Sequence, residues 1–507
     1  MDLNWFDYLA FAAFIGVVFA VSLRVGRREK SSEDYFLAGR NLTWWLIGFS
    51  LIASNISTEH FVGMAGKGFG LGLAIASYEW MAAVTLVIVA WFFLPKFLRC
   101  GIFTMPQFLE YRYSGLTRTI MAAFMMAAYV VVALATVLYS GALAINAIFG
   151  MDTTVAIWLI GLTAGAYTIY GGLKAVVWSD LIQGAALLLG GVVVTILGLQ
   201  AVGGIEVFLQ ESGAKLHTVL PWDHPELPWL AVFVGGLWIP NLFYWGLNQF
   251  ITQRTLGAKN LAEAQKGIFL AAFLKLLIPF IIVFPGIMAF QLYGATLANP
   301  DQAYPHMISR ILPAGLRGLM FAALFGAVMS SIDSMLNSAS TIFTIDLYKR
   351  YWNKKAGPGK LVAVGRIATA VFVLFGCIWA PVIASFGSVF DYIQKFWGFI
   401  TPGIVAAFVV GLLFKRTPAS AANGALVLGI PIYGVLLWAL PEVAFLHHMA
   451  ITFMILVVFM LAVTVARPVA EPARLPVSEL DVEMLPSAWL WGCVIIATTL
   501  GLYLIFW

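Results

Sequence analysis

The feature that most limits what this chain can fold into is a series of apolar runs, each about 20 residues long, which recurs along its whole length. A run of about that length crosses the roughly 30 Å hydrocarbon core of a bilayer as an α-helix. Only 10% of the 507 residues are charged, whereas about a quarter of the residues in soluble proteins are charged. The alternating pattern of a membrane β-barrel is absent from the sequence. The sequence therefore predicts an all-α polytopic membrane protein.

We predict about 14 transmembrane helices, arranged in a single transmembrane domain over residues 1–507. The first, Phe6–Leu23, follows an acidic start and lacks a small-residue cleavage site, so we expect a retained helix rather than a signal peptide. The fourteen predicted helices cover 6–24, 42–64, 71–95, 119–148, 153–171, 180–201, 229–250, 266–292, 314–346, 364–387, 391–414, 420–440, 446–465 and 486–506.

The distribution of Lys and Arg predicts the orientation of these helices. Most of the 29 Lys and Arg residues fall in every second connection, as in "RVGRREK", "PKFLRCG", "TQRTLGAKN", "DLYKRYWNKK" and "FKRT". Positively charged connections remain in the cytoplasm. We therefore expect the first connection to lie inside the cell and both termini to face outward. This pattern accounts for the net charge of +5, and we expect no nucleic-acid partner.

A polar interruption lies within the second predicted helix, in Leu51–Gly66, "LIASNISTEHFVGMAG". Non-helical backbone is tolerated at membrane depth only where it lines a cavity or is buried in protein. Ser and Asn side chains compete with helical hydrogen bonds. We therefore predict that the helix unwinds at "SNIS", which would free carbonyl groups to coordinate a cation.

A second interruption follows Pro240, in Asn241–Gln249, "NLFYWGLNQ". Proline lacks the backbone donor of a continuous helix and clashes with the preceding turn. Two interrupted helices, one in each half of a chain, are typical of secondary transporters with inverted repeats. The residues leave a second interpretation open, in which both segments are ordinary polar contacts between helices.

Several stretches resemble the sodium:solute symporter family, in particular its sodium/glucose cotransporter group and the bacterial sodium/galactose member of that group. They cover Ser31–Pro418 in order and include "SLIASNISTEHFVGMAG", "LAIASYEWM", "YGGLKAVVWSD", "NLFYWGLNQFITQRTLGAK", "AAFLKLLIPF", "SSIDSMLNSASTIFTIDLYK" and "YIQKFWGFITPG". The resemblance implies a five-plus-five inverted-repeat (LeuT-like) core at 42–414. The helix at 6–24 and the helices at 420–506 would then be peripheral, and the two interrupted segments would begin the two repeats.

A sugar presents hydroxyl groups and an apolar ring face, so its site needs polar side chains and an aromatic plate. Ionisable groups inside membrane spans are functional candidates. The resemblance implies that the following residues contact the sugar: Asn55, His60, Tyr78, Glu79, Asn241, Tyr244, Lys275 and Gln394. It also implies that Tyr244 stacks on the sugar and closes the inner side with Trp245, while Met64, Tyr78 and Phe390 form an outer lid.

Alternatives to these assignments remain. Glu79 and Lys275 can form a purely structural buried ion pair, and His60 can be a structural histidine. Position 82 is Ala, where the bacterial galactose member has a Ser that reaches the sugar. One hydroxyl contact is therefore missing, which leaves the choice among hexoses open.

Sodium prefers hard oxygen ligands, as calcium and magnesium do. The resemblance implies a sodium site made by carbonyl groups of the first interrupted helix and by a later helix, from the following residues: Ala53, Ile56, Ala327, Ser330 and Ser331. Back-bonding of the serines to the preceding turn is the structural alternative. We further hypothesise a second cation site at Asp180, Asp333 and Ser334; N-capping of a helix is the alternative for Asp180.

The sequence thus predicts sodium-coupled symport of a hexose of the glucose or galactose type by alternating access. Sodium would be the co-transported ion, with no cofactor and no enzymatic activity. The resemblance implies a bacterial inner-membrane protein, surrounded by lipid, that works as a monomer. The rivals are a symporter of the same family for myo-inositol, sialic acid, an amino acid or a vitamin, a membrane-embedded enzyme, and a sensor. The enzyme is disfavoured because no span has a His/Asp/Glu cluster and no Gly-x-Ser-x-Gly elbow occurs.

Overall fold

The computed structural model describes residues 4–26, 31–57, 59–386 and 389–507, and it leaves out the side chains of 59, 147–148, 384–386, 389–392 and 394. Within this part the regular elements are helices, and two isolated β-bridges are the only strand-like pairings.

The first half of the chain contains α1 (Trp5–Val25), α2 (Ser32–Leu37), α3 (Trp44–Asn55), α4 (Ala65–Gly70), α5 (Ser77–Ile88), α6 (Leu94–Arg99), α7 (Met105–Arg112), α8 (Gly115–Ala127), α9 (Leu134–Phe149), α10 (Thr153–Ala201) and α11 (Ile205–Glu211). The second half contains α12 (Trp229–Phe233), α13 (Trp238–Leu242), α14 (Gln249–Leu256), α15 (Leu261–Tyr293), α16 (Ala303–Ile311), α17 (Leu316–Ile342), α18 (Pro358–Trp379), α19 (Val389–Leu413), α20 (Ala419–Ala439), α21 (Phe445–Ala466) and α22 (Ala488–Ile505). Wider π-helical turns occupy Glu59–Met64, Val89–Phe93, Ala128–Ala133, Phe243–Leu247 and Phe343–Trp352. Tighter 3-10 turns occupy Ala38–Arg40, Leu73–Ala76, Gly213–Lys215, Pro300–Gln302 and Ala380–Phe386.

Twelve helices of the described part are long and apolar enough to cross a membrane, and two features reconcile this number with the fourteen predicted spans. The α10 helix has 49 residues and merges the predicted spans 153–171 and 180–201. A straight helix of that length would measure about 73 Å, more than twice the bilayer core. It bends instead at Gly172, whose φ of 50° and ψ of −153° are open to glycine. The predicted span 42–64 is divided where α3 ends at Asn55, and neither piece alone is long enough to cross a membrane.

Both predicted interruptions are confirmed. The α3 helix ends at Asn55, and Ile56 has extended backbone (φ −77°, ψ 103°); after the break the chain is helical again and continues through α4 to Gly70. The second interruption falls at Asn248, which is also extended (φ −81°, ψ 121°), between a π-helical turn and α14. The helix ends leave backbone groups without intrahelical partners, so both segments present main-chain donors and acceptors to the surrounding helices.

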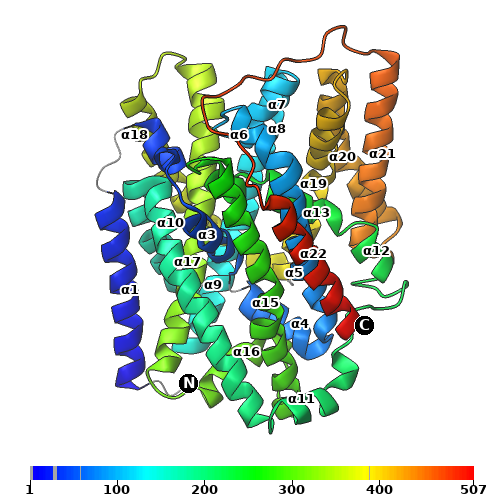
Figure 1. Cartoon of the computed structure of the whole chain (residues 1–507). Coiled ribbons are helices and arrows are strands. Elements are labelled where there is room, and N and C mark those ends of the chain that lie inside the picture. Colours follow the sequence, from blue (N-terminus) through cyan, green and yellow to red (C-terminus); the bar gives the residue numbers. More distant parts are fainter. Residues whose placement is uncertain (1–3, 27–30, 58, 387–388) are drawn as a thin grey trace.

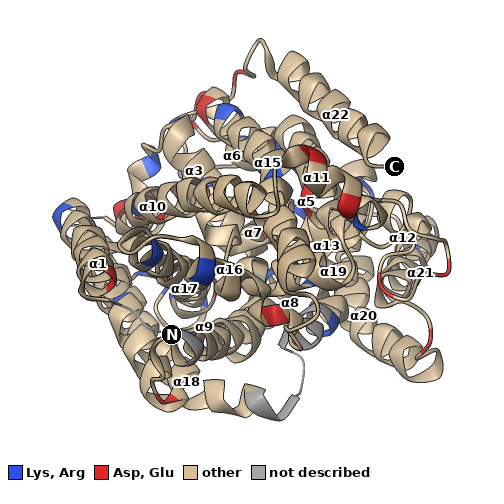
Figure 2. Ribbon diagram, turned by 90° about the horizontal axis from the view of Figure 1, so that it is seen from below, with Lys and Arg blue, Asp and Glu red and all other residues tan. Residues whose placement is uncertain are grey.

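The helices form one bundle whose centre contains the two interrupted segments. The α10 and α17 helices pack against each other, and α15 packs against α3, α4 and α5. In Figure 1, α1 lies at the left edge and α20, α21 and α22 lie at the right. Figure 2 shows the bundle from below, with few charged residues among the ribbons, as expected of a protein that faces lipid.

Both chain ends lie toward the lower side of the bundle in Figure 1, with α11 and α16. Near the start of the chain, Asp7 accepts hydrogen bonds from the backbone of Gly315 and Gly318, at 2.9 and 3.0 Å. At the other end, the carbonyl of Phe506 accepts from the backbone N–H of Thr218 at 2.8 Å. The two termini therefore share one side of the molecule.

Candidate functional site

A cavity of about 170 Å³ lies where the two interrupted helices meet. Its walls come from both broken segments and from α5, α9, α15, α17 and α19, and residues far apart in sequence therefore converge there. The lining residues are Ser54, Asn55, Ser57, His60, Met64, Lys67, Ile75, Tyr78, Glu79, Ala82, Ala133, Val137, Leu237, Pro240, Asn241, Phe243, Tyr244, Trp245, Phe250, Lys275, Ser331, Met335, Ile393, Trp397 and Thr401.

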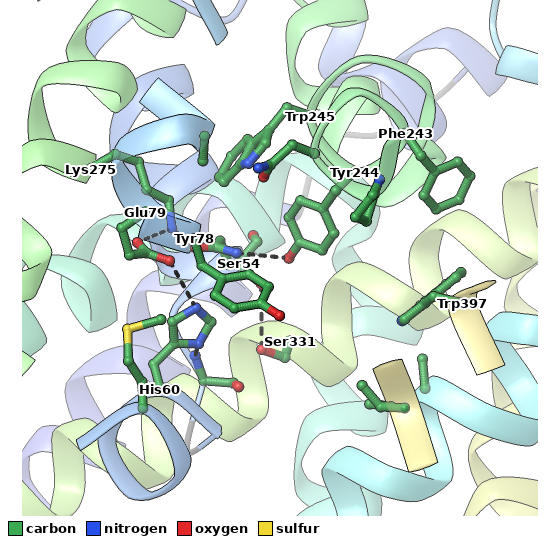
Figure 3. Close-up of a pocket in the computed structure, with 18 of the residues that line it drawn as sticks. Ser54, His60, Tyr78, Glu79, Phe243, Tyr244, Trp245, Lys275, Ser331 and Trp397 are labelled. Carbon is green, nitrogen blue, oxygen red and sulfur yellow. Dashed lines mark hydrogen bonds and ion pairs between the residues drawn. The ribbon is translucent and has the colours of Figure 1, made fainter. Parts of the chain in front are cut away.

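The charged centre of the cavity is the ion pair between Glu79 of α5 and Lys275 of α15. The two side chains face each other in Figure 3, with His60 beside them. Glu79 is 3% exposed and Lys275 is 0% exposed. His60 Nε2 lies 3.5 Å from Glu79 Oε1. Because removing charges from water is unfavourable, the pair is stable only with further hydrogen bonds.

Lys275 makes such a bond to the first interrupted helix. Its Nζ donates to Oδ1 of Asn55, the last residue of α3 before the break. The same Nζ lies 5.0 Å from the centre of the Trp245 ring, which belongs to the second interrupted helix. The lysine therefore joins the two broken helices electrostatically.

The cavity has an aromatic wall at the second break. Asn55 Nδ2 donates to the hydroxyl of Tyr244 at 3.1 Å. The Tyr244 ring meets Phe250 edge-on with centroids 5.4 Å apart, and it lies against Trp245 at 5.1 Å. This arrangement supplies an apolar plate beside polar atoms, the combination that a sugar requires.

Two buried polar atoms on the cavity wall have no hydrogen-bond partner among the described residues. They are Nδ2 of Asn241 and Oγ1 of Thr401. Asn241 is 8% exposed, so bulk solvent has little access to its amide. Buried polar groups are almost always hydrogen-bonded, and these two atoms are therefore suited to a polar ligand in the cavity.

The α17 helix contacts the first break through Ser331. The Ser331 hydroxyl donates to the carbonyl oxygen of Ser54 at 3.5 Å, and Ser331 also lines the cavity. Ala53 and Ile56 flank this carbonyl, and both are buried. The last carbonyls of α3 project beyond the helix end, and a serine hydroxyl beside them completes a set of hard oxygen atoms.

A second buried cluster surrounds the guanidinium of Arg254, which is 1% exposed. Its Nη2 lies 3.0 Å from Oδ2 of Asp180 and 2.5 Å from the Ser334 hydroxyl. Its Nε donates to the Ser50 hydroxyl at 2.6 Å. Ser54 also accepts from this guanidinium and donates to Asp180 at 3.1 Å. One arginine of α14 thus ties together α3, α10 and α17.

Residues 35–430 match the profile of the sodium:solute symporter family. The chain belongs to the sodium:solute symporter family.

Two relatives and one solved structure are similar to this symporter over most of its length. A protein named sodium/glucose cotransporter from Vibrio parahaemolyticus is 44% identical over 85% of this chain and 84% of its own length. A protein named sodium/myo-inositol cotransporter 2 from Sus scrofa is 35% identical over 84% of this chain and 68% of its own length. A sodium-coupled sialic acid symporter has a similar fold, with a TM-score of 0.83, 24% identity, and coverage of 94% and 100% of the two chains. These similarities confirm the predicted family and the LeuT-like fold.

Most of the predicted sugar residues of the symporter lie together at the cavity. They are Asn55, His60, Tyr78, Glu79, Asn241, Tyr244 and Lys275, with Met64 and Trp245 of the predicted gates. Gln394 and Phe390 also belong to the predicted set, but their side chains lie outside those the structure describes. Ala82 lines the cavity as expected, so the cavity wall has no side-chain hydroxyl at this position.

The predicted second cation residues do not share one cluster. Asp180 and Ser334 belong to the Arg254 cluster, whereas Asp333 accepts hydrogen bonds from Tyr167 and, at 2.7 Å, from Thr168. Neighbouring residues on a helix point about 100° apart, so Asp333 and Ser334 meet different partners. Asp180 also lies inside α10 rather than at its start, and the N-cap interpretation is wrong.

The sodium residues predicted on α17 divide in a similar way. Ser331 contacts the break, but Ser330 donates to Oδ1 of Asp180 at 2.5 Å. Ala327 is buried one turn before Ser331. Ser330 therefore supports the Asp180 carboxylate in this conformation.

Sequence reasoning missed three functional candidates. The stretch "TQRTLGAKN" predicts a positively charged connection that contains Arg254, but the Arg254 side chain is buried in α14. Thr401 and Trp397 of α19 line the cavity. Both lie in the stretch "YIQKFWGFITPG", from which only Gln394 was predicted to contact the sugar. The run "NQFITQR" offered one signal for Arg254, since an arginine directly after a broken helix requires a buried partner if the helix continues.

Proposed function

We propose that this symporter moves a hexose of the glucose or galactose type into the cell together with sodium, by alternating access and without covalent chemistry. One observation supports the proposal above all others. The Glu79–Lys275 pair, Asn55 and the Tyr244 ring converge in a buried cavity between the two interrupted helices. Such a cavity offers donors, acceptors and an aromatic face to one small polyhydroxyl solute.

We assign the recognition of the sugar hydroxyls to the charged pair and to the unpartnered amide. Glu79 accepts hydrogen bonds, Lys275 donates them, and Nδ2 of Asn241 is free to donate among the described residues. Tyr244 packs on the apolar face of the ring. Gln394 and His60 complete the proposed set, and Tyr78, Met64 and Phe390 form the outer lid.

We assign the sodium site to the junction of α3 and α17. The carbonyls of Ala53 and Ile56 and the Ser331 hydroxyl would hold the ion, with Ser330 and Ala327 on the same helix. The contact between Ser331 and the Ser54 carbonyl supports this assignment, because it already joins the two elements that the ion would bridge. Ser330 would have to exchange its bond to Asp180 for one to sodium.

The proposed cycle uses this bridge for coupling. Sodium entering from outside stabilises the outward-open state, and the sugar then binds at the charged pair. The outer lid closes, Tyr244 moves away from Asn55, and both solutes leave inward. Sodium biases the cycle only by its difference in affinity between the two states.

The available driving force sets the accumulation that one ion supports. Moving one charge through about 100 mV supplies roughly 2.3 kcal/mol, and a tenfold sodium gradient adds about 1.4 kcal/mol. One sodium per sugar would support roughly 500-fold accumulation, and two would support more than about 10⁵-fold.

The second cation site at Asp180, Asp333 and Ser334 stays a prediction. Arg254 already supplies a positive charge to Asp180, which counts against a resident cation there in this conformation. Reversal potentials in reconstituted protein give the number of sodium ions per sugar. A ratio of one that is unchanged in Asp333→Ala removes the second site.

We further propose that the symporter is a monomer in the bacterial inner membrane, with both termini facing outward. The basic connections predict this orientation, and the shared side of the two termini is compatible with it. Residues 42–414 would form the transporting core, with 6–24 and 420–506 as peripheral helices.

The decisive experiment is uptake of radiolabelled sugar into proteoliposomes under an imposed sodium gradient, competed by a panel of hexoses. Glu79→Ala should abolish uptake, and Ser331→Ala should abolish it at the sodium concentration that suffices for the unmodified symporter. Glu33→Ala is a matched control, because Glu33 also pairs with a basic residue, Arg40, at 2.7 Å, but neither residue lines the cavity, and it should retain uptake. Full uptake without sodium would overturn the coupling.

A second candidate substrate is myo-inositol, because one relative bears that name at 35% identity and inositol is also a polyhydroxyl ring. Sialic acid, an amino acid and a vitamin are the other candidates within the family. Adding each solute to the competition panel separates them, since the true substrate competes at the lowest concentration.

A further inference from the structure

We propose that a second cavity, at the end of the bundle opposite the chain termini, binds the phosphate headgroup of an anionic membrane phospholipid. This basic cavity has a volume of about 720 Å³ and lies between the start of α8 and the last turns of the helix that continues α17 to Trp352. Arg118, Lys349, Arg350 and Lys354 line it. It is separate from the sugar cavity, so the inference does not depend on the transported solute.

The charge of the basic cavity is strongly one-sided. Its lining among the described residues contains four cationic side chains and no carboxylate. The carboxylates of Glu110 and Asp346 form ion pairs with the two arginines. Glu110 pairs with both Arg118, at 2.5 Å, and Arg350, and Asp346 lies 2.6 Å from Arg118 Nε.

The two lysines provide the surplus charge. Lys349 and Lys354 are exposed, and no ion pair to either is found within the described ranges. The arginine–carboxylate platform, formed by Arg118, Arg350, Glu110 and Asp346, is neutral as a whole and is connected by ion pairs. The basic cavity therefore presents two uncompensated ammonium groups above a preformed surface that also offers guanidinium donors to a phosphate.

The surroundings favour a lipid over a soluble anion. The membrane-spanning segment Leu316–Trp352 ends at this site, and its last residues, Tyr351 and Trp352, are 57% and 67% exposed. Tyrosine and tryptophan concentrate at the level of lipid headgroups. Leu116, which lines the basic cavity, is 60% exposed and offers an apolar surface to an acyl chain.

A bound headgroup would add to hydrogen bonds that already connect α8 to the extension of α17. Thr119 and Tyr351 share a hydrogen bond of 2.6 Å, and Arg118 donates to the carbonyl of Ile345 at 3.1 Å. The same long helix contains Ser331. Basic pockets between membrane helices on the cytoplasmic side bind anionic headgroups in this way, and this end is cytoplasmic in the proposed orientation.

The test uses the purified full-length chain in a neutral detergent. Native mass spectrometry measures the binding of dioleoylphosphatidylglycerol, of dioleoylphosphatidylcholine and of inorganic phosphate. The test variant is Lys349→Gln/Lys354→Gln, in which both substitutions are exposed and leave the arginine platform intact. The matched control is Lys360→Gln/Lys415→Gln, which removes two exposed lysines of the same basic end from outside the cavity.

Preferential binding of phosphatidylglycerol by the unmodified chain, weakened about thirtyfold in the test variant and unchanged in the control, supports the proposal. Thirtyfold corresponds to about 2 kcal/mol at 1.4 kcal/mol per tenfold. Equal binding of both lipids, or an equal loss in the control, overturns it. Displacement of the lipid by millimolar inorganic phosphate also overturns it, because the site would then belong to a soluble anion.

Discussion

The pair of Glu79 and Lys275 allows a structural role to be separated from a transport role by experiment. Both side chains are almost fully buried. Among the described residues, the only other basic side chain that contacts Glu79 is His60, whose Nε2 lies 3.5 Å from Glu79 Oε1. Lys275→Met leaves the carboxylate without its main partner. Breaking a buried pair in this way costs about 3–5 kcal/mol, so we expect a clear fall in the thermal unfolding midpoint in detergent.

The double variant Glu79→Leu/Lys275→Met removes both charges at once. Replacing a buried pair by apolar residues of similar volume is often neutral, so we expect most of the lost stability to return. Sugar uptake should not return, because the donors and acceptors for the hydroxyls remain absent. Comparing the unfolding midpoints and the uptake rates of the unmodified chain, Lys275→Met and the double variant separates the structural role from the transport role. Recovered uptake in the double variant would refute the sugar-binding role, and an unchanged midpoint in Lys275→Met would refute the argument from buried charge.

Three further predictions concern other sites. Ser331→Ala should regain uptake only at raised sodium, with a half-saturating concentration at least about tenfold higher, because one oxygen ligand is lost; Ser340→Ala, which removes a hydroxyl bonded only within its own helix, should leave sodium activation unchanged. Arg254→Gln should lower the unfolding midpoint by leaving Asp180 unpaired, at a cost of about 3–5 kcal/mol, and Asp180→Asn in the same chain should restore it; a stable single variant would contradict this. Burial raises the pKa of Glu110, but hydrogen bonds and charges from its two arginine partners outweigh burial and hold the pKa below the ordinary value of 4.5. Its stabilising effect is therefore complete above pH 4.5 and is lost as the pH falls through the lower folded pKa, so Glu110→Gln should flatten the melting curve's dependence on pH below about 4.5, and an identical acid profile would count against the pairing.

The positions of the two breaks could be predicted because their cause is local. Ser54, Asn55 and Ser57 interrupt an apolar run, and Pro240 precedes the second interruption; both effects act within a few residues of the backbone. The structure has the breaks at Ile56 and Asn248, inside the predicted segments. The spans 153–171 and 180–201 were predicted with a connection between them, whereas the structure has only the non-helical Gly172 (φ 50°, ψ −153°) there, and the helix continues directly after it.

The partners of the buried charges could not be predicted from local patterns. Asp180, Asp333 and Ser334 were grouped because they are polar and close in sequence or in family position. In the structure, Asp180 forms an ion pair with Arg254, whereas Asp333 accepts hydrogen bonds from Tyr167 and Thr168. Which charged groups meet is decided by how four helices pack, and a step of one residue along a helix, about 100° of rotation, changes the partner.

By itself, the sequence determined that the chain spans a membrane many times, where its helices break and which polar side chains lie at membrane depth. These properties follow from free energies of transfer to lipid and from backbone preferences, both of which depend on residues close together in the chain. Only the tertiary structure decided that Lys275 reaches Asn55 and that Arg254 is buried rather than exposed in a loop. Contacts of this kind join residues some 200 positions apart, and packing of distant helices fixes them.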